Sequence, residues 1–242
     1  MASDSGDDVV GALNTVDEQL EFDAPDRHIV MSIASSTDVD HSGLQAWPCC
    51  QLVCDWFLRT DTQPRLGQST ILEVGCGPGL VAVVLGPSAK AFVASDHDDD
   101  VLSLCKSNLQ RNGLADRVQT RRIDVVELAA GDTPFDAVPI ENVDYLIACD
   151  LVFEDVLTSS LVNLSSRYLA KGARVLIAVE SRVNFIVATM AIADVALDHF
   201  RRCVDDAGLG LVLVDMGDIA SATSLERSPT SLLFEIVTGG PR

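Results

Sequence analysis

Short apolar runs alternate with segments of helical spacing over most of the chain. Runs of aliphatic and β-branched residues predict seven main strands, at residues 70–74, 89–95, 117–123, 143–149, 173–179, 209–216 and 232–237. Apolar residues that recur every three or four positions predict helices at residues 45–58, 80–85, 101–109, 156–169 and 189–206. An alternating stretch at residues 28–35 predicts one short strand before them.

The order of these elements predicts an α/β fold. Repeated strand–helix units favour a doubly wound, mostly parallel seven-strand sheet that is covered on both faces. The last two predicted strands have no helix between them, so we expect a hairpin-like pair. The more polar strand at residues 117–123 is expected near a sheet edge. In such sheets ligands bind beyond the carboxyl ends of the strands, where the strand order reverses.

A glycine turn follows the first strand of the predicted sheet. Residues 73–79 read E-V-G-C-G-P-G and precede an apolar helix. Glycines let the backbone bend sharply and let a ligand lie against the main chain, and the helix N-terminus beyond them offers free N–H groups. A dinucleotide-binding turn reads G-x-G-x-x-G, whereas the third glycine here comes one residue earlier, at Gly79. The E-x-G-x-G-x-G spacing resembles motif I of the seven-strand methyltransferases, which bind S-adenosylmethionine (SAM). A tight structural turn is the alternative.

Carboxylates follow the ends of the next three strands. Asp96 comes about 20 residues after the first glycine, where a carboxylate can accept hydrogen bonds from both ribose hydroxyls; its alternative role is to cap the following helix. Asp124 can accept from an adenine amino group or stand as a solvated strand end. Asp150 and Phe153 can orient an alkylammonium by charge and by a cation–π face. Their alternative is a helix cap with the phenylalanine in the core.

Composition narrows the class of function. The 242 residues carry a formal net charge of −19, which disfavours nucleic-acid binding and suits a basic partner or solubility alone. Seven cysteines without a C-x-x-C pair and four scattered histidines predict buried free thiols and no metal site. We find no signal peptide or membrane span, and expect a cytoplasmic and/or nuclear protein. Residues 1–26 are acidic and expected to be flexible, which leaves residues 27–242 as one domain.

Several of these motifs together resemble one protein family. They are G-L-Q-A-W-P at residues 43–48, the glycine turn, Ser95-Asp96 and D-L-V-F at residues 150–153. In this order they resemble the family 16 protein methyltransferases, mostly protein-lysine enzymes with a D-x-x-Y/F motif. The resemblance covers about residues 28–237, and residues 180–185 and 198–200 are most similar to one branch. It implies the Rossmann-like fold of class I methyltransferases, with SAM as the cofactor.

The resemblance also assigns roles to individual residues. Asp150 and Phe153 match the motif that binds the substrate lysine. The resemblance, together with the glycine turn and the strand-end carboxylates, implies contacts with the cofactor at ten residues. They are Trp47, Glu73, Gly75, Cys76, Gly77, Gly79, Asp96, Asp124, Val125 and Cys149. Two positions depart from the family pattern. Val125 stands where a tryptophan is common near the adenine, and Phe153 replaces the commoner tyrosine.

The sequence is therefore expected to encode a SAM-dependent protein-lysine N-methyltransferase whose partner is a basic, lysine-containing segment of a protein. Such an enzyme mainly aligns the amine with the methyl group and excludes water. Asp150 is expected to orient the amine and not to act as a base, because a carboxylate stabilises the ammonium form. The alternatives are a small-molecule N-methyltransferase with a closed pocket and a SAM-binding interaction module without catalysis.

Overall fold

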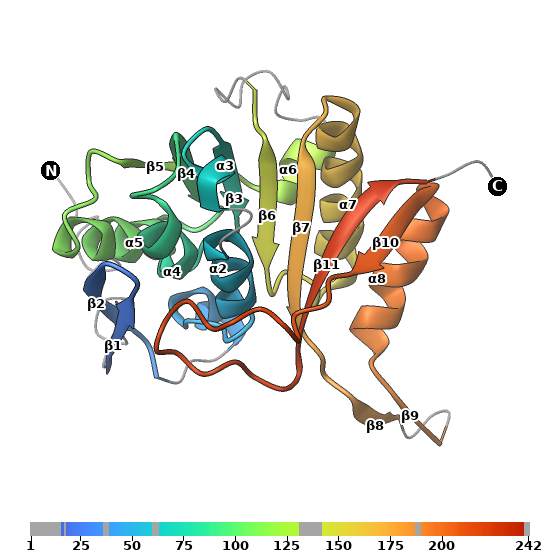
Figure 1. Cartoon of the computed structure of the whole chain (residues 1–242). Helices are drawn as coiled ribbons and strands as arrows, with labels where there is room; N and C mark the ends of the chain where they lie inside the picture. The colour runs from blue at the N-terminus through green and yellow to red at the C-terminus, as the bar shows by residue number, and fades with distance from the viewer. Residues whose placement is uncertain are drawn as a thin grey trace, which may run out of the picture.

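A seven-stranded sheet forms the centre of the computed structural model, which describes residues 16, 18–35, 39–59, 63–130, 142–186 and 190–239. The strand order is β10-β11-β7-β6-β3-β4-β5. The strands are β3 (Thr70–Val74), β4 (Ala91–Asp96), β5 (Val118–Arg122), β6 (Tyr145–Cys149), β7 (Arg174–Glu180), β10 (Leu209–Leu213) and β11 (Ser231–Thr238). Figure 1 shows the sheet crossing the molecule between two sets of helices.

The strand pairing confirms the predicted fold class. β3 pairs in parallel with both β4 and β6, while β5 and β7 extend these pairs outward. β11 is antiparallel to both of its neighbours, β7 and β10, so the last two strands form the expected pair. The more polar β5 lies at an edge, as predicted. The strand order reverses between β3 and β6, and the carboxyl ends of both strands face the same edge.

Helices cover the two faces of the sheet separately. One face packs against α2 (Cys50–Leu58), α4 (Leu80–Leu85) and α5 (Asp99–Arg111), and the other against α6 (Val125–Ala130), α7 (Asp155–Ala170) and α8 (Val195–Asp206). Two short helices, η1 (Val39–Leu44) and α3 (Gln63–Leu66), flank α2. Along β3, Ile71 belongs to the first core and Leu72 to the second. Both faces are buried, and for this reason the strand reads as a continuous apolar run.

The N-terminal part of the described chain is more regular than expected. β1 (Glu18–Ala24) and β2 (Arg27–Ile33) form an antiparallel hairpin. The Asn108 side chain of α5 holds this hairpin, because it accepts from the Ser32 N–H at 2.7 Å and donates to the Ser32 carbonyl at 2.9 Å. The first strand of this hairpin belongs to the segment 1–26 that was expected to be flexible. Residues 1–15 lie outside the described residues.

The helix predicted at residues 189–206 starts later than expected. Only α8 is helical, and a small hairpin of β8 (Asn184–Ile186) and β9 (Ala191–Ala193) precedes it. Asp194 sets the boundary, because its carboxylate accepts from the Leu197 N–H and caps the helix. It also accepts from the Arg182 N–H at 2.7 Å and the Ser181 hydroxyl at 3.0 Å. Figure 1 shows the hairpin projecting beyond the end of β7.

Two further expectations concern the described part of the chain. There, no helix is both long and apolar enough to cross a membrane, and no three His, Cys, Asp or Glu side chains come together as a metal site. The seven cysteines are free thiols, and all but Cys203 are buried.

Candidate active site

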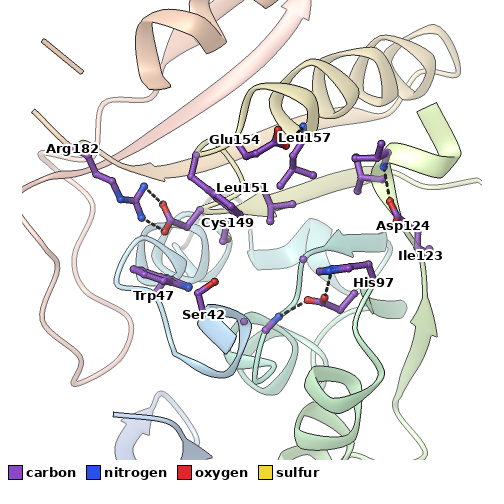
Figure 2. A pocket seen from close by; sticks show the side chains of 18 residues that line it. Ser42, Trp47, His97, Ile123, Asp124, Cys149, Leu151, Glu154, Leu157 and Arg182 are labelled. Carbon is purple, nitrogen blue, oxygen red and sulfur yellow. Dashed lines mark hydrogen bonds and ion pairs between the residues drawn. The ribbon is translucent and has the colours of Figure 1, made fainter. Parts of the chain in front are cut away.

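A cavity of about 460 Å³ opens at the carboxyl ends of the central strands, as the reversal of strand order predicts. Nine of the predicted site residues line it, namely Trp47, Gly75, Gly77, Asp96, Asp124, Val125, Cys149, Asp150 and Phe153. Figure 2 shows Trp47 and Arg182 at one end of the cavity and His97, Ile123 and Asp124 at the other. The fold therefore brings together residues that lie more than 100 positions apart in the sequence, such as Trp47 and Arg182.

The glycine turn forms the floor of the cavity between these ends. Gly75 and Gly77 have φ angles of 68° and 54°, in the left-handed region that favours glycine. A Cβ at Gly75 would lie 2.6 Å from Leu151 Cδ2, and one at Gly77 would lie 3.3 Å from the Gly43 carbonyl oxygen. A side chain at Gly75 would collide with Leu151, and one at Gly77 would be tightly placed in a strained backbone conformation, so the turn leaves bare main chain at the cavity.

Three predicted residues of the turn do not line the cavity. Glu73 is buried in β3, and its Oε2 has no hydrogen-bond partner within the described residues. Burial raises the pKa of the Glu73 carboxyl well above its ordinary value, which favours its protonated form. Cys76 is buried, and Gly79 begins α4 with its backbone against Cys105. Glu73, Cys76 and Gly79 therefore support the turn without lining the cavity.

Asp96 presents a carboxylate at the end of β4. It is nearly buried and accepts from the Gly77 N–H at 3.3 Å, which ties it to the glycine turn. The helix cap belongs to its neighbour Asp98, which accepts from the Asp100 and Val101 N–H groups. The alternative role of Asp96 as the cap of α5 therefore does not hold. His97 lies 3.2 Å from Asp96, and this hydrogen bond raises the pKa of the His97 imidazole against the opposing effect of burial.

At the far end of the cavity, the wall formed by residues 123–126 has one carboxylate and several apolar side chains. Asp124 accepts from the Val126 N–H at 2.8 Å and the Glu127 N–H at 3.2 Å, so it caps α6 while it lines the cavity. Ile123 and Val125 stand beside it. This wall offers apolar contact to a flat ring, although it holds no aromatic side chain.

The near end centres on Asp150, which follows β6 in a left-handed conformation with φ of 56°. Its Oδ1 accepts from Arg182 Nη1 at 3.0 Å and from the Glu180 N–H at 3.2 Å, and its Oδ2 pairs with Arg182 Nη2. The Arg182 guanidinium also lies over the Trp47 ring, 5.4 Å from its centroid. The dashed lines beside Arg182 in Figure 2 mark the ion pair.

Phe153 and Cys149 complete this end. Phe153 is 50% exposed at the mouth of the cavity, so the alternative that it belongs to the core is wrong. The cap of α7 is Glu154, which accepts from the Val156 and Leu157 N–H groups; Asp150 is therefore not a helix cap. A hydrogen bond with Cys50 and burial both raise the pKa of the Cys149 thiol well above its ordinary value, which keeps it neutral.

A sequence model described as lysine methyltransferase matches residues 27–190. The chain belongs to the lysine methyltransferase family. Methyltransferase-like protein 22 of Mus musculus is 28% identical over 217 residues, which are 82% of this chain and 53% of the mouse protein. The Homo sapiens protein of the same name is 26% identical over 186 residues, 70% of this chain and 46% of that protein. This branch is the one that residues 180–185 and 198–200 resemble. The chain spans about half the length of these relatives.

Solved structures place the fold of this family member among the methyltransferases. A ribosomal protein L11 methylase from Lactobacillus delbrueckii subsp. bulgaricus is 12% identical with a TM-score of 0.53, covering 91% of this chain and all of that one. The magnesium protoporphyrin IX methyltransferase ChlM from Synechocystis, solved with S-adenosylhomocysteine (SAH), is 12% identical with a TM-score of 0.52, covering 85% of this chain and 90% of that one. SAM is the cofactor of this methyltransferase fold.

The cavity residues of this member of the family fit SAM. The cavity size lies within the range of cofactor sites. The bare glycine turn gives room for the methionine portion, Asp96 offers an acceptor for ribose hydroxyls, and the apolar wall beyond it suits a purine. Sequence reasoning missed Arg182 and His97 as cavity residues. His97 directly follows Asp96 and could have been included, whereas Arg182 is brought to the site by its contacts with Asp150 and Trp47, which lie far from it in the sequence.

Proposed function

We propose that this domain transfers a methyl group from SAM to the side-chain amine of a lysine in a protein. The observation that carries the proposal is the pair of Asp150 and Phe153 at the mouth of the cavity. The carboxylate is fixed at the end of β6, and the aromatic ring is half exposed beside it. Membership of the lysine methyltransferase family supports the same substrate class.

The chemistry requires an uncharged amine in a dry site. Bound SAM supplies a methyl group on a positively charged sulfur, and the amine lone pair forms the new N–C bond as the S–C bond breaks and its electron pair stays on sulfur. A free lysine has a pKa of about 10.4, so its ammonium must first lose a proton to water. Leu151, Phe153 and Leu157 line the same cavity and would offer apolar surface to the amine, which favours its uncharged form.

A protein substrate fits the surroundings of the cavity better than a small molecule. The hairpin of β8 and β9, with the residues that flank these strands, exposes large apolar side chains. Val183 and Phe185 are more than half exposed, and Met190 and Ile192 are 74% exposed. Contiguous exposed apolar side chains are typical of interaction surfaces. A segment of a protein could lie against this hairpin while its lysine enters the cavity. The formal charge of −19 favours a basic segment.

A labelling experiment tests the substrate class. The protein is incubated with methyl-tritiated SAM and with cell extract, in which the lysines of one aliquot are blocked by acetylation. We expect label in the protein fraction of the untreated extract and its loss after acetylation. The Gly75→Arg variant, whose new side chain fills the cradle, is the control for enzyme-dependent label. Label in the small-molecule fraction would contradict the proposal, and so would unchanged protein label after acetylation.

A further inference from the structure

Arg182 occupies the charge-binding face of the carboxylate that the proposed function assigns to the substrate amine. Both oxygens of Asp150 pair with the guanidinium, and Oδ1 also accepts a backbone N–H. The Asp150 side chain is only 2% exposed, whereas the Arg182 side chain is 36% exposed toward the cavity. Arg182, and not a substrate ammonium, is therefore the counterion of Asp150.

The position of Arg182 is fixed from several sides. Its backbone N–H donates to Asp194 at 2.7 Å, and its guanidinium carbon lies 5.4 Å from the centroid of the Trp47 ring. Because Asp194 also caps α8, its contact with Arg182 ties the arginine to the start of α8, while the pair with Asp150 ties it to the end of β6. A guanidinium that binds a carboxylate with two nitrogens has a defined orientation, which a lysine could not reproduce.

The net charge at the amine site follows from this pair. An isolated carboxylate close to an amine would raise the amine pKa by stabilising the ammonium, and would oppose methyl transfer. The Asp150–Arg182 pair carries no net charge. We infer that Arg182 is a positioning residue, which orients Asp150 and compensates its charge so that the bound substrate amine can lose its proton. This inference rests on the proposed transfer to a lysine amine.

The other charged groups near Arg182 are already engaged. Glu180, at the end of β7, accepts from the hydroxyls of Ser228, Thr230 and Ser231. Asp194 and Glu154 cap helices, and the buried Cys49 thiol is neutral because its hydrogen bond with Cys50 and its burial raise its pKa well above the ordinary value. His97 and Asp124 lie at the other end of the cavity, and Asp96 is hydrogen-bonded to His97 there. Removal of Arg182 would therefore leave Asp150 as an uncompensated charge at the amine site.

The test is the pH dependence of kcat with saturating SAM and saturating protein substrate, because kcat reports ionisations in the bound complex. In Arg182→Gln we expect the midpoint of the rise in kcat to move up by about one pH unit, so that activity falls about 10-fold below the midpoint and recovers at high pH. Asp150→Asn leaves the Arg182 charge without its carboxylate, so we expect the midpoint of the kcat profile to move down. The double variant Asp150→Asn with Arg182→Gln should return the midpoint toward the wild-type value.

Two further variants and the shape of the pH profile separate this role from a purely structural one. Arg182→Lys keeps the positive charge but loses the two-nitrogen contact with Asp150. The midpoint of its kcat profile should therefore stay near that of wild type, while its maximal kcat falls. Arg201→Gln removes an exposed arginine that pairs with Asp198, and it should match wild type throughout. A loss in Arg182→Gln that is equal at every pH would overturn the inference, as would an unchanged profile. If the wild-type protein labels no lysine at all, the proposed function fails instead.

Discussion

The two ends of the cavity hold carboxylates in similar places but in different electrostatic surroundings. Asp96 is the last residue of β4, accepts from a backbone N–H of the glycine turn and lies 3.2 Å from the His97 imidazole, whereas Asp150 follows β6 and is paired with a guanidinium. Asp96 therefore has a titratable partner, and Asp150 has a permanently charged one. Under the proposed function Asp96 serves the cofactor and Asp150 serves the amine substrate, and the partner of each carboxylate accounts for the difference.

The largest effect is expected between the two ends, at Gly75. Gly75→Arg forces a side chain into a left-handed position with Leu151 at 2.6 Å from the new Cβ, and should abolish SAM binding. Calorimetric titration of the folded variant with SAM measures this. Gly113→Ala is the matched control, because Gly113 has φ of 72° and nothing within 4 Å of a new Cβ. If Gly75→Arg bound SAM with wild-type affinity, the glycine turn would not be part of the SAM site.

The next largest effect is expected at the substrate end. Asp150→Ala should lower the single-turnover methylation rate by about 100-fold or more, because a misplacement of about 1 Å can cost that much. The SAM dissociation constant should stay close to wild type. If the variant loses SAM binding to the same extent, the residue belongs to the cofactor half of the cavity, and the difference between the two ends disappears.

The matching change at the cofactor end is Asp96→Ala. We expect weaker SAM binding by about 1.5–3 kcal/mol, the range for hydrogen bonds to a charged group, or roughly 10- to 150-fold. The methylation rate at saturating SAM should change much less than in Asp150→Ala. Unchanged SAM affinity in Asp96→Ala would leave this carboxylate with only its contact to the glycine turn.

A smaller effect is expected at the apolar hairpin beside the substrate end. Phe185 and Ile192 are paired across β8 and β9, so their double replacement by serine removes exposed apolar surface without loss of core packing. The KM for a protein substrate should rise about 10-fold, the scale of truncating one or two interface residues. Val212→Ser, at an exposed site on β10, is the control. An equal KM in both variants would place the substrate elsewhere.

The smallest effect concerns His97. Its hydrogen bond with Asp96 raises its folded pKa, so the stabilisation is complete below about pH 6.5 and is lost as the pH rises through the raised value. We expect wild type to unfold at higher urea concentration than His97→Gln at about pH 5.5, and at the same concentration at about pH 8.5. A difference that grows with pH would have the wrong sign for this pair.

Local patterns in the sequence were sufficient to predict the fold class and to bring the glycine turn and Asp96 to one cavity. The glycine turn and Asp96 belong to consecutive elements, and their spacing is set by one strand and one helix. Arg182 could not be assigned in this way, because it meets Asp150 from 32 positions away and only through the pairing of β6 with β7. Asp194 could not be recognised either, because it stands within a helical pattern as an ordinary polar position. In the structure its carboxylate accepts from the Leu197 N–H and caps α8, and it also accepts from the Arg182 N–H.

The most direct measurement is the mass-spectrometric location of the transferred methyl group. Extract proteins are methylated with deuterated-methyl SAM by wild type and by Asp150→Ala, digested, and compared peptide by peptide. The account predicts deuterated methyl groups on lysine Nζ atoms with wild type and their near-complete loss with the variant, while both proteins bind SAM equally. Label on other atoms, or the same lysine label from both proteins, would contradict it.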